Sequence, residues 1–274
     1  MEGKVTIPAL LEMKRASQKI VGVVVYDFQM AQVVDRAGID LVSVGDSIGV
    51  NLWGHANELE VTLDEMILAC RAVRRGVKRA LVSCDFPYGP LQQGTDSAVR
   101  AAIRLVKEGG ADLVKVDGAS TFPEAVEAIT RAGIPVWAQF GITPQTAMRY
   151  GGMAAAGPEL SAQMKDRLLE EARALEQAGA VLLDFTNSGP IAGAEVARAA
   201  AIPVIGGLGG GPWLDGRIRA AFAALGYLAN AIDDTRTERY AELARTALDA
   251  MTTFAADVRA GRQIRGAGVR TVTT

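Results

Sequence analysis

Three aspartates follow three short apolar runs, and their carboxylates are the clearest candidates for chemistry in the sequence. Asp46 comes after IDLVSVG, Asp85 after RALVSC and Asp117 after ADLVKV. If the runs are neighbouring strands, the carboxylates meet at one edge and repel one another unless a cation lies among them. Oxygen ligands with open coordination positions suit Mg2+. The pattern predicts a magnesium site; the alternative is that each aspartate only caps the helix after its strand.

A lysine accompanies the third of these carboxylates. Lys115 lies two residues before Asp117, so strand alternation points both side chains to the same face. In a closed barrel that face is the interior, where a lysine can bind a substrate carboxylate or stabilise developing negative charge beside a metal. The alternative is a lysine that only forms salt bridges with neighbouring aspartates.

Eight segments share one pattern and would position these side chains. Each is a short run of apolar and β-branched residues that ends on a polar residue or a glycine: residues 20–27, 39–47, 79–86, 111–118, 134–141, 180–187, 202–209 and 225–232. Amphipathic stretches such as TDSAVRAAIRLVKEGG separate most of them, with apolar residues at every third or fourth position. Buried strands alternating with helices predict an α/β fold with a parallel sheet, here a (β/α)8 TIM barrel.

The barrel prediction fixes the expected domain and the place of the site. We expect a single domain over residues 1–274, with surface helices from about residue 233 and a frayed C-terminus. In such barrels the active site lies at the C-terminal ends of the strands, where the three aspartates stand.

The composition is that of an ordinary globular chain. It has 274 residues, 49% of them hydrophobic and 22% charged, and a formal net charge of -2. This charge gives no reason to expect binding to nucleic acid or to an anionic membrane. No apolar run approaches the roughly 18 residues of a membrane span, and the N-terminus lacks the apolar core of a signal peptide. We expect a cytoplasmic protein with Cys70 and Cys84 reduced and structural.

Several longer motifs carry a resemblance to a known family over roughly residues 5–220. They are YDFQMAQVVDRAGIDLVSVGDSIG, WGHANELEVTLDEMI, AVRRG, DFPYG, GGADLVKVDG, AGIPVWAQFGITPQ, the glycine pair at 151 and 152, LEQAGA and IPVIGGLGGG. In this order they resemble the ketopantoate hydroxymethyltransferase family, in the phosphoenolpyruvate mutase and isocitrate lyase superfamily.

The resemblance implies a reaction, a cofactor and partners. A 2-oxo acid, 3-methyl-2-oxobutanoate or an analogue, chelates Mg2+, loses its C3 proton and attacks a one-carbon unit delivered by 5,10-methylenetetrahydrofolate. This is an aldol-type transfer of pantothenate biosynthesis. The resemblance also implies a large homo-oligomer, for which the family example is a decamer.

Position by position, the resemblance gives roles to four of the residues above and to one neighbour. Asp46 and Asp85 match metal-site carboxylates, Asp85 also facing the substrate, while Ser47 and Lys115 match residues that hold the 2-oxo acid. Asp117 stands where the family usually has Glu. The shorter side chain keeps the charge but reduces the reach, so coordination through water would replace direct coordination of the metal.

Two departures from the family affect proton transfer. Gln139 stands where the family usually has His, and Thr186 where it has the Glu that takes the C3 proton. We expect both to contact the substrate, but neither can act as a base near neutral pH. Asp184 has the same parity as Thr186 and lies one layer deeper, about 6.6 Å lower. It could accept the proton directly or through a water, or it could simply pair with Lys115.

These departures leave three functions open. The first is hydroxymethyl transfer with Asp184 or water as base. The second is a metal-dependent lyase or decarboxylase, because C–C cleavage leaves electrons on C3 without removal of a proton. The third is a catalytically silent relative that binds a 2-oxo acid.

Two further features have weaker functional readings. His55, the only histidine, is expected at the rim in a structural role. The glycine run 206–211 could cradle a phosphate or could simply be a glycine-rich strand end. The Lys-Pro segment that the family has after its eighth strand is missing from LGYLANAIDD.

Overall fold

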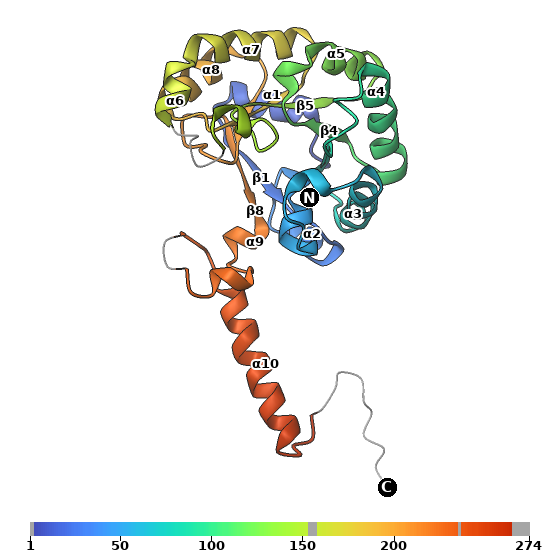
Figure 1. Cartoon of the computed structure of the whole chain (residues 1–274), viewed down its shortest axis with the longest axis vertical. Coiled ribbons are helices and arrows are strands. Elements are labelled where there is room, and N and C mark those ends of the chain that lie inside the picture. Colours follow the sequence, from blue (N-terminus) through green and yellow to red (C-terminus); the bar gives the residue numbers. More distant parts are fainter. Residues whose placement is uncertain (1–2, 153–157, 235–236, 265–274) are drawn as a thin grey trace. The chain divides into compact units, whose positions relative to one another are not determined.

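The computed structural model describes residues 3–152, 158–234 and 237–264 (Figure 1). The chain divides into two compact units, Met1–Ala220 and Ala221–Thr274. Within the described ranges, no helix combines the length and the apolar character that a bilayer span needs.

The first unit is a closed barrel of eight parallel strands, each paired with the next and the last with the first. The TIM barrel prediction is therefore confirmed. The strands are β1 (Ile20–Val24), β2 (Leu41–Val44), β3 (Leu81–Asp85), β4 (Leu113–Val116), β5 (Val136–Gly141), β6 (Leu182–Thr186), β7 (Val204–Gly206) and β8 (Gly216–Ala220).

The eighth strand does not lie where the sequence pattern put it. Residues 225–232 were expected to form it, but they contain turns and the 3-10 helix Ala229–Ala231. The strand is the segment GRIRA, which pairs with β1 from Ile20 opposite Gly216 to Val24 opposite Ala220. The prediction was wrong because this strand alternates, with Ile218 buried inside and Arg217 exposed outside, whereas a continuous apolar run was sought.

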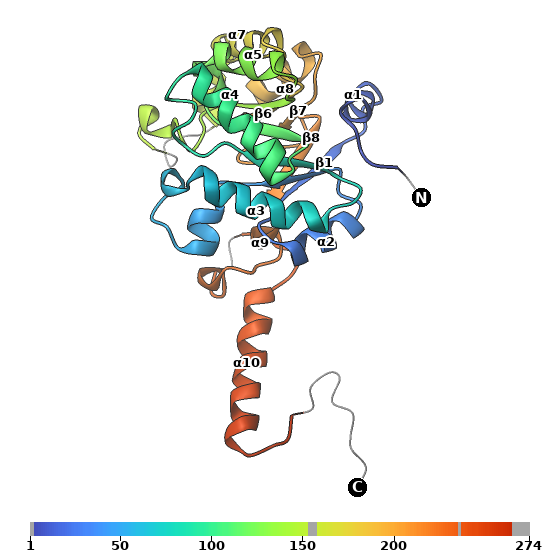
Figure 2. The same ribbon diagram turned by 90° about the vertical axis from the view of Figure 1, so that its right-hand side faces the viewer.

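Helices cover the outside of the barrel, as Figures 1 and 2 show. They are α2 (Phe28–Arg36), α3 (Leu63–Gly76), α4 (Thr95–Arg104), α5 (Pro123–Arg131), α6 (Pro158–Gln163), α7 (Lys165–Gln177) and α8 (Pro190–Ala199). Side chains cap the starts of two of them: Asp27 accepts from the Met30 amide at α2, and Thr62 and Glu65 form a capping box at α3. Cys70 and Cys84 are both free and buried, as expected.

One ring of inward side chains fixes which residues face the barrel interior. It takes one apolar residue from each strand: Ile20, Leu41, Leu81, Leu113, Trp137, Leu182, Ile205 and Ile218. Val5 and Leu10 pack against this ring, so α1 (Ile7–Arg15) closes that end of the barrel. Because side chains alternate, the residues two and four positions beyond the ring also point inward.

The second unit consists of α9 (Ala221–Ala224), the 3-10 helix Ala229–Ala231 and α10 (Leu243–Arg259). The amides of Leu243 and Ala244 donate to the carbonyls of Leu225 and Gly226 at 3.0 and 2.9 Å, which ties the start of α10 to the turn after α9. The expected fraying of the last residues falls on 265–274, outside the described residues.

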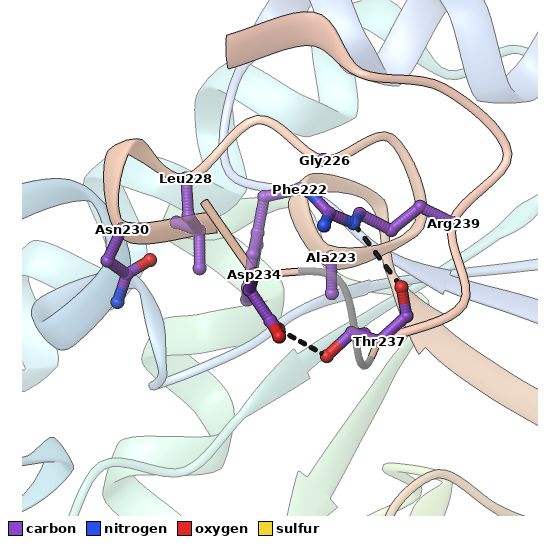
Figure 3. A pocket seen from close by; sticks show the side chains of 8 residues that line it. All are labelled: Phe222, Ala223, Gly226, Leu228, Asn230, Asp234, Thr237 and Arg239. Atoms are coloured by element: carbon purple, nitrogen blue, oxygen red, sulfur yellow. Dashed lines mark hydrogen bonds between the residues drawn. The ribbon is translucent and has the colours of Figure 1, made fainter. Parts of the chain in front are cut away.

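A pocket of about 340 Å³ lies within this second unit (Figure 3). Its polar lining residues bond to one another: the Thr237 hydroxyl donates to Asp234 at 2.7 Å, and Arg239 Nε donates to the Thr237 carbonyl at 3.3 Å. Arg239 also pairs with Glu242 at 2.9 Å. These contacts hold the segment before α10 together.

Candidate active site

The residues singled out in the sequence converge on the C-terminal end of the barrel interior. Two and four residues beyond the apolar ring, the inward positions are polar on five consecutive strands. They are Ser43 on β2, Ser83 and Asp85 on β3, Lys115 on β4 with Asp117 just after it, Gln139 on β5, and Asp184 and Thr186 on β6, all buried. Asp46 and Ser47 follow β2 and are half-buried.

Lys115 is the centre of this cluster. Its Nζ lies 3.0 Å from Asp184 Oδ2 and 3.5 Å from Asp85 Oδ2, and 5.2 Å from the centre of the Trp137 ring. Burial alone would lower the pKa of Lys115, but the charges of Asp85 and Asp184 outweigh it and raise that pKa above its usual value. The ammonium group therefore stays charged at neutral pH.

The surroundings of the three predicted metal carboxylates disfavour the negatively charged form, so all three have raised pKa values. Loss of hydration, followed by the charges of Asp85 and Asp117, raises the pKa of Asp46 to about 8. Burial also raises the pKa of Asp85, although Lys115 and a 3.0 Å hydrogen bond from Ser43 oppose the shift. For Asp117, burial raises the pKa to about 6.

The loop after β5 holds two of these carboxylates. The backbone nitrogen of Gln145 donates to Asp117 Oδ2 at 3.3 Å, and its side-chain Nε2 donates to Asp46 Oδ2, also at 3.3 Å. The other oxygen of Asp117 is buried without a hydrogen-bond partner in the described part of the chain. Gln145 thus bridges the strand ends of β2 and β4.

These carboxylates do not act as helix caps. The helices after β2, β3 and β4 begin with Thr62, Gly94 and Phe122 at their N-cap positions. The capping alternative is therefore wrong, and local helix geometry does not account for Asp46, Asp85 or Asp117.

The geometry bears on how a cation would be held. Across residues 3–152, 158–234 and 237–264, no group of three or more His, Cys, Asp or Glu side chains is spaced to hold a metal ion. Asp46, Asp85 and Asp117 therefore do not form a preformed cage of three direct ligands, and Asp117 Oδ2 instead accepts a hydrogen bond from the Gln145 backbone nitrogen. Mg2+ commonly takes only one or two carboxylates and keeps water or substrate oxygens in its other positions. The raised pKa values and the unpartnered Asp117 oxygen fit such a cation.

Ser47 is fixed by residues that the sequence analysis missed. Its hydroxyl lies 2.9 Å from the Tyr26 hydroxyl, and Asn51 donates to the Ser47 carbonyl at 2.8 Å. Burial raises the pKa of Tyr26 above its ordinary value, so its phenol stays protonated. The signal that could have found Tyr26 is its parity: it lies two residues beyond Val24, the last residue of β1. Gln145, by contrast, lies in a loop and gives no such signal.

Gln139 and Thr186 form a neutral pair where the family has ionisable groups. Gln139 Nε2 donates to Thr186 Oγ1 at 2.9 Å, and both side chains are buried. Asp184 lies opposite Gln139 in the register of β5 and β6, one inward position below Thr186. Its Oδ2 pairs with Lys115, while Oδ1 is buried without a partner among the described residues.

The two weaker features have packing explanations. The His55 amide donates to the Gly49 carbonyl at 2.9 Å, and its ring lies 5.8 Å from that of Trp53, within the loop after β2. In the glycine run, a Cβ on Gly210 would come within 2.6 Å of the Gly206 carbonyl oxygen. Close backbone packing therefore explains a glycine there without a phosphate.

The raised carboxylate pKa values predict a pH dependence. Both Asp46 and Asp117 have folded-state pKa values above the ordinary 3.8, so the folded state binds more protons than the unfolded state above about pH 4. Without metal, the free energy of unfolding should fall as the pH rises from about 4 to about 8. Because Mg2+ would offset the repulsion, we expect it to raise the melting temperature more at about pH 8.5 than at about pH 5.5 in scanning fluorimetry. A pH-independent Mg2+ shift would contradict this.

Comparisons with known proteins show the family of this chain. A model described as ketopantoate hydroxymethyltransferase matches residues 4–263. A protein from Cyanothece sp. (strain PCC 7425 / ATCC 29141), named 3-methyl-2-oxobutanoate hydroxymethyltransferase, is 40% identical over 96% of this chain and 99% of its own. A relative of the same name from Pelobacter propionicus is 37% identical over 95% of each chain.

Solved structures share the fold at low sequence identity. 2,3-Dimethylmalate lyase, described as a PEP mutase/isocitrate lyase superfamily member, superposes with a TM-score of 0.61 at 17% identity, covering 97% of this chain and 91% of that one. Oxaloacetate acetylhydrolase gives a TM-score of 0.60 at 13% identity, covering 96% and 89%. The sequence relatives are more specific than these fold neighbours: the chain belongs to the ketopantoate hydroxymethyltransferase family of transferases.

Proposed function

We propose that this protein transfers a hydroxymethyl group to C3 of a 2-oxo acid, 3-methyl-2-oxobutanoate or a close analogue, with Mg2+ and with 5,10-methylenetetrahydrofolate as donor. The observation that carries the proposal is the buried Lys115 ammonium between Asp85 and Asp184, beside carboxylates with raised pKa values. Membership of the family and the names of the relatives support it.

In this proposal Asp46 and Asp85 hold the cation, and Asp117 reaches it through water. The bound cation would supply Lewis-acid polarisation of the 2-oxo group. Donors for a small anion are also present: Lys115 binds the substrate carboxylate, and Ser47, held by Tyr26, donates a hydrogen bond to it. Removal of these charges from water is costly, which supports a site that holds a charged ligand here.

Proton removal from C3 falls to Asp184 in the proposed reaction. Gln139 and Thr186 form a neutral pair that can orient the substrate but cannot accept a proton at neutral pH. Asp184 is an inward carboxylate opposite Gln139 and one inward position below Thr186, and its Oδ1 has no hydrogen-bond partner among the described residues. It would accept the proton directly or through one water.

The neutral Gln139–Thr186 pair also favours a second candidate function. A metal-dependent lyase or decarboxylase acting on a substituted 2-oxo acid generates the C3 carbanion by breaking a C–C bond, so it needs no base at these positions. This candidate predicts turnover of an oxaloacetate-like or aldol-type substrate.

Deuterium exchange at C3 separates these candidates. With Mg2+ and without folate, 3-methyl-2-oxobutanoate in D2O should exchange its C3 proton, measured by NMR, and Asp184→Asn should slow this exchange about a hundredfold or more. Ser83→Ala is the matched control, because Ser83 also faces inward but its buried hydroxyl has no partner in the described chain. No exchange in the wild type, with metal and oxo acid bound, would favour the lyase.

A further inference from the structure

Lys115 is held by two carboxylates of different depth. Its Nζ is closer to Asp184, at 3.0 Å, than to Asp85, at 3.5 Å. Asp184 lies nearer the closed end of the barrel, one inward position below Thr186, whereas Asp85 ends its strand at the open end. The ammonium group is thus drawn toward the interior, away from the position where a substrate would enter.

Among the described residues, Asp184 has no cationic partner other than Lys115. Within the described ranges, Lys115 is the only Lys or Arg that forms an ion pair with either Asp85 or Asp184. A substrate carboxylate that binds Lys115 must therefore compete with Asp184 for the same ammonium group. Lysine suits such an exchange, because its charge sits on a flexible four-carbon chain with three rotatable donors.

We infer that Lys115 changes partners when the 2-oxo acid binds, and that this exchange frees Asp184 to act. Without substrate, Lys115 neutralises Asp184; with substrate, the ammonium moves to the substrate carboxylate and leaves the Asp184 carboxylate unpaired beneath C3. The C3 proton then passes to Asp184, and the electron pair of the broken C–H bond forms the new C–C bond to the one-carbon unit of the donor. The carbon–nitrogen bonds of that unit break with their electron pairs left on the folate nitrogens, and water supplies the hydroxyl oxygen. This inference rests on the proposed function.

The exchange makes a specific prediction about affinity. Asp184→Asn removes the competitor of the substrate, so it should bind 3-methyl-2-oxobutanoate about tenfold more tightly in titration calorimetry with Mg2+, a change at the low end of coupling between close charges. The same variant should lose C3 exchange. Tighter binding together with lost exchange is a split that a merely structural role for Asp184 would not produce.

A double-mutant cycle identifies Lys115 as the shared partner. In a Lys115→Met background, Asp184→Asn should give no gain in oxo acid affinity, because there is no ammonium to release. An equal gain in both backgrounds would mean simple repulsion between Asp184 and the substrate, and would overturn the exchange. Ser83→Ala should leave the affinity unchanged.

A crystal structure of the wild type with Mg2+ and 3-methyl-2-oxobutanoate provides a test that needs no variant to fold. Lys115 Nζ should lie within hydrogen-bond distance of the substrate carboxylate and beyond about 4 Å from Asp184. A lysine that keeps its 3.0 Å contact with Asp184 would overturn the inference. Absence of transferase activity with the affinity changes intact would instead count against the proposed function alone.

Discussion

Asp46→Asn should greatly reduce Mg2+-dependent turnover and at the same time stabilise the metal-free protein. The carboxylate has a pKa of about 8 because it is removed from water and lies near Asp85 and Asp117. Neutralising it removes this repulsion, which we expect to raise the free energy of unfolding by about 1 kcal/mol at pH 8. Loss of a metal ligand should lower kcat/KM by about a thousandfold.

Two measurements with one control check this pair of opposite effects. Chemical denaturation without metal gives the change in stability, and the Mg2+ dependence of the hydroxymethyl transfer rate gives the change in activity. Asp249→Asn is a control with an exposed carboxylate on α10, and it should change neither quantity. An Asp46→Asn variant that is less stable than the wild type, or that keeps its response to Mg2+, would contradict the assignment.

Lys115→Met should lose activity and stability together. The variant lacks the cation proposed to bind the substrate carboxylate and to stabilise developing charge, so we expect about a thousandfold lower kcat/KM. It also leaves Asp85 and Asp184 buried without their ion pair, at a cost of about 3 kcal/mol. Denaturation and steady-state kinetics on the same preparation measure both losses.

A double variant separates these two losses. Lys115→Met with Asp184→Asn removes both charges of the closer ion pair, so most of the stability should return. The activity should not return, because neither replacement can bind a carboxylate or accept a proton. Recovery of activity in the double variant would show that Lys115 and Asp184 act only in folding.

The period of two along a strand made much of the site predictable from the sequence. It predicts inward positions for Lys115 with Asp117, and for Asp184 with Thr186. The same reasoning failed at β8, because its outward arginines break the apolar run. The more apolar residues 225–232 were therefore predicted as the eighth strand. Gln145 could not be predicted because a loop has no such period, and its contacts with Asp46 and Asp117 depend on how that loop folds back.

The apolar ring and α1 close one end of the barrel, so a ligand reaches the interior from the other end. A ligand that reaches Lys115 must pass the strand ends where Asp46 and Asp117 lie, and a bulkier second ligand at the opening would block its way out. The reaction should therefore follow a compulsory order, in which the small oxo acid enters first and its product leaves last. The hydroxymethylated oxo acid, which leaves last, should inhibit competitively with respect to the oxo acid substrate and noncompetitively with respect to the one-carbon donor.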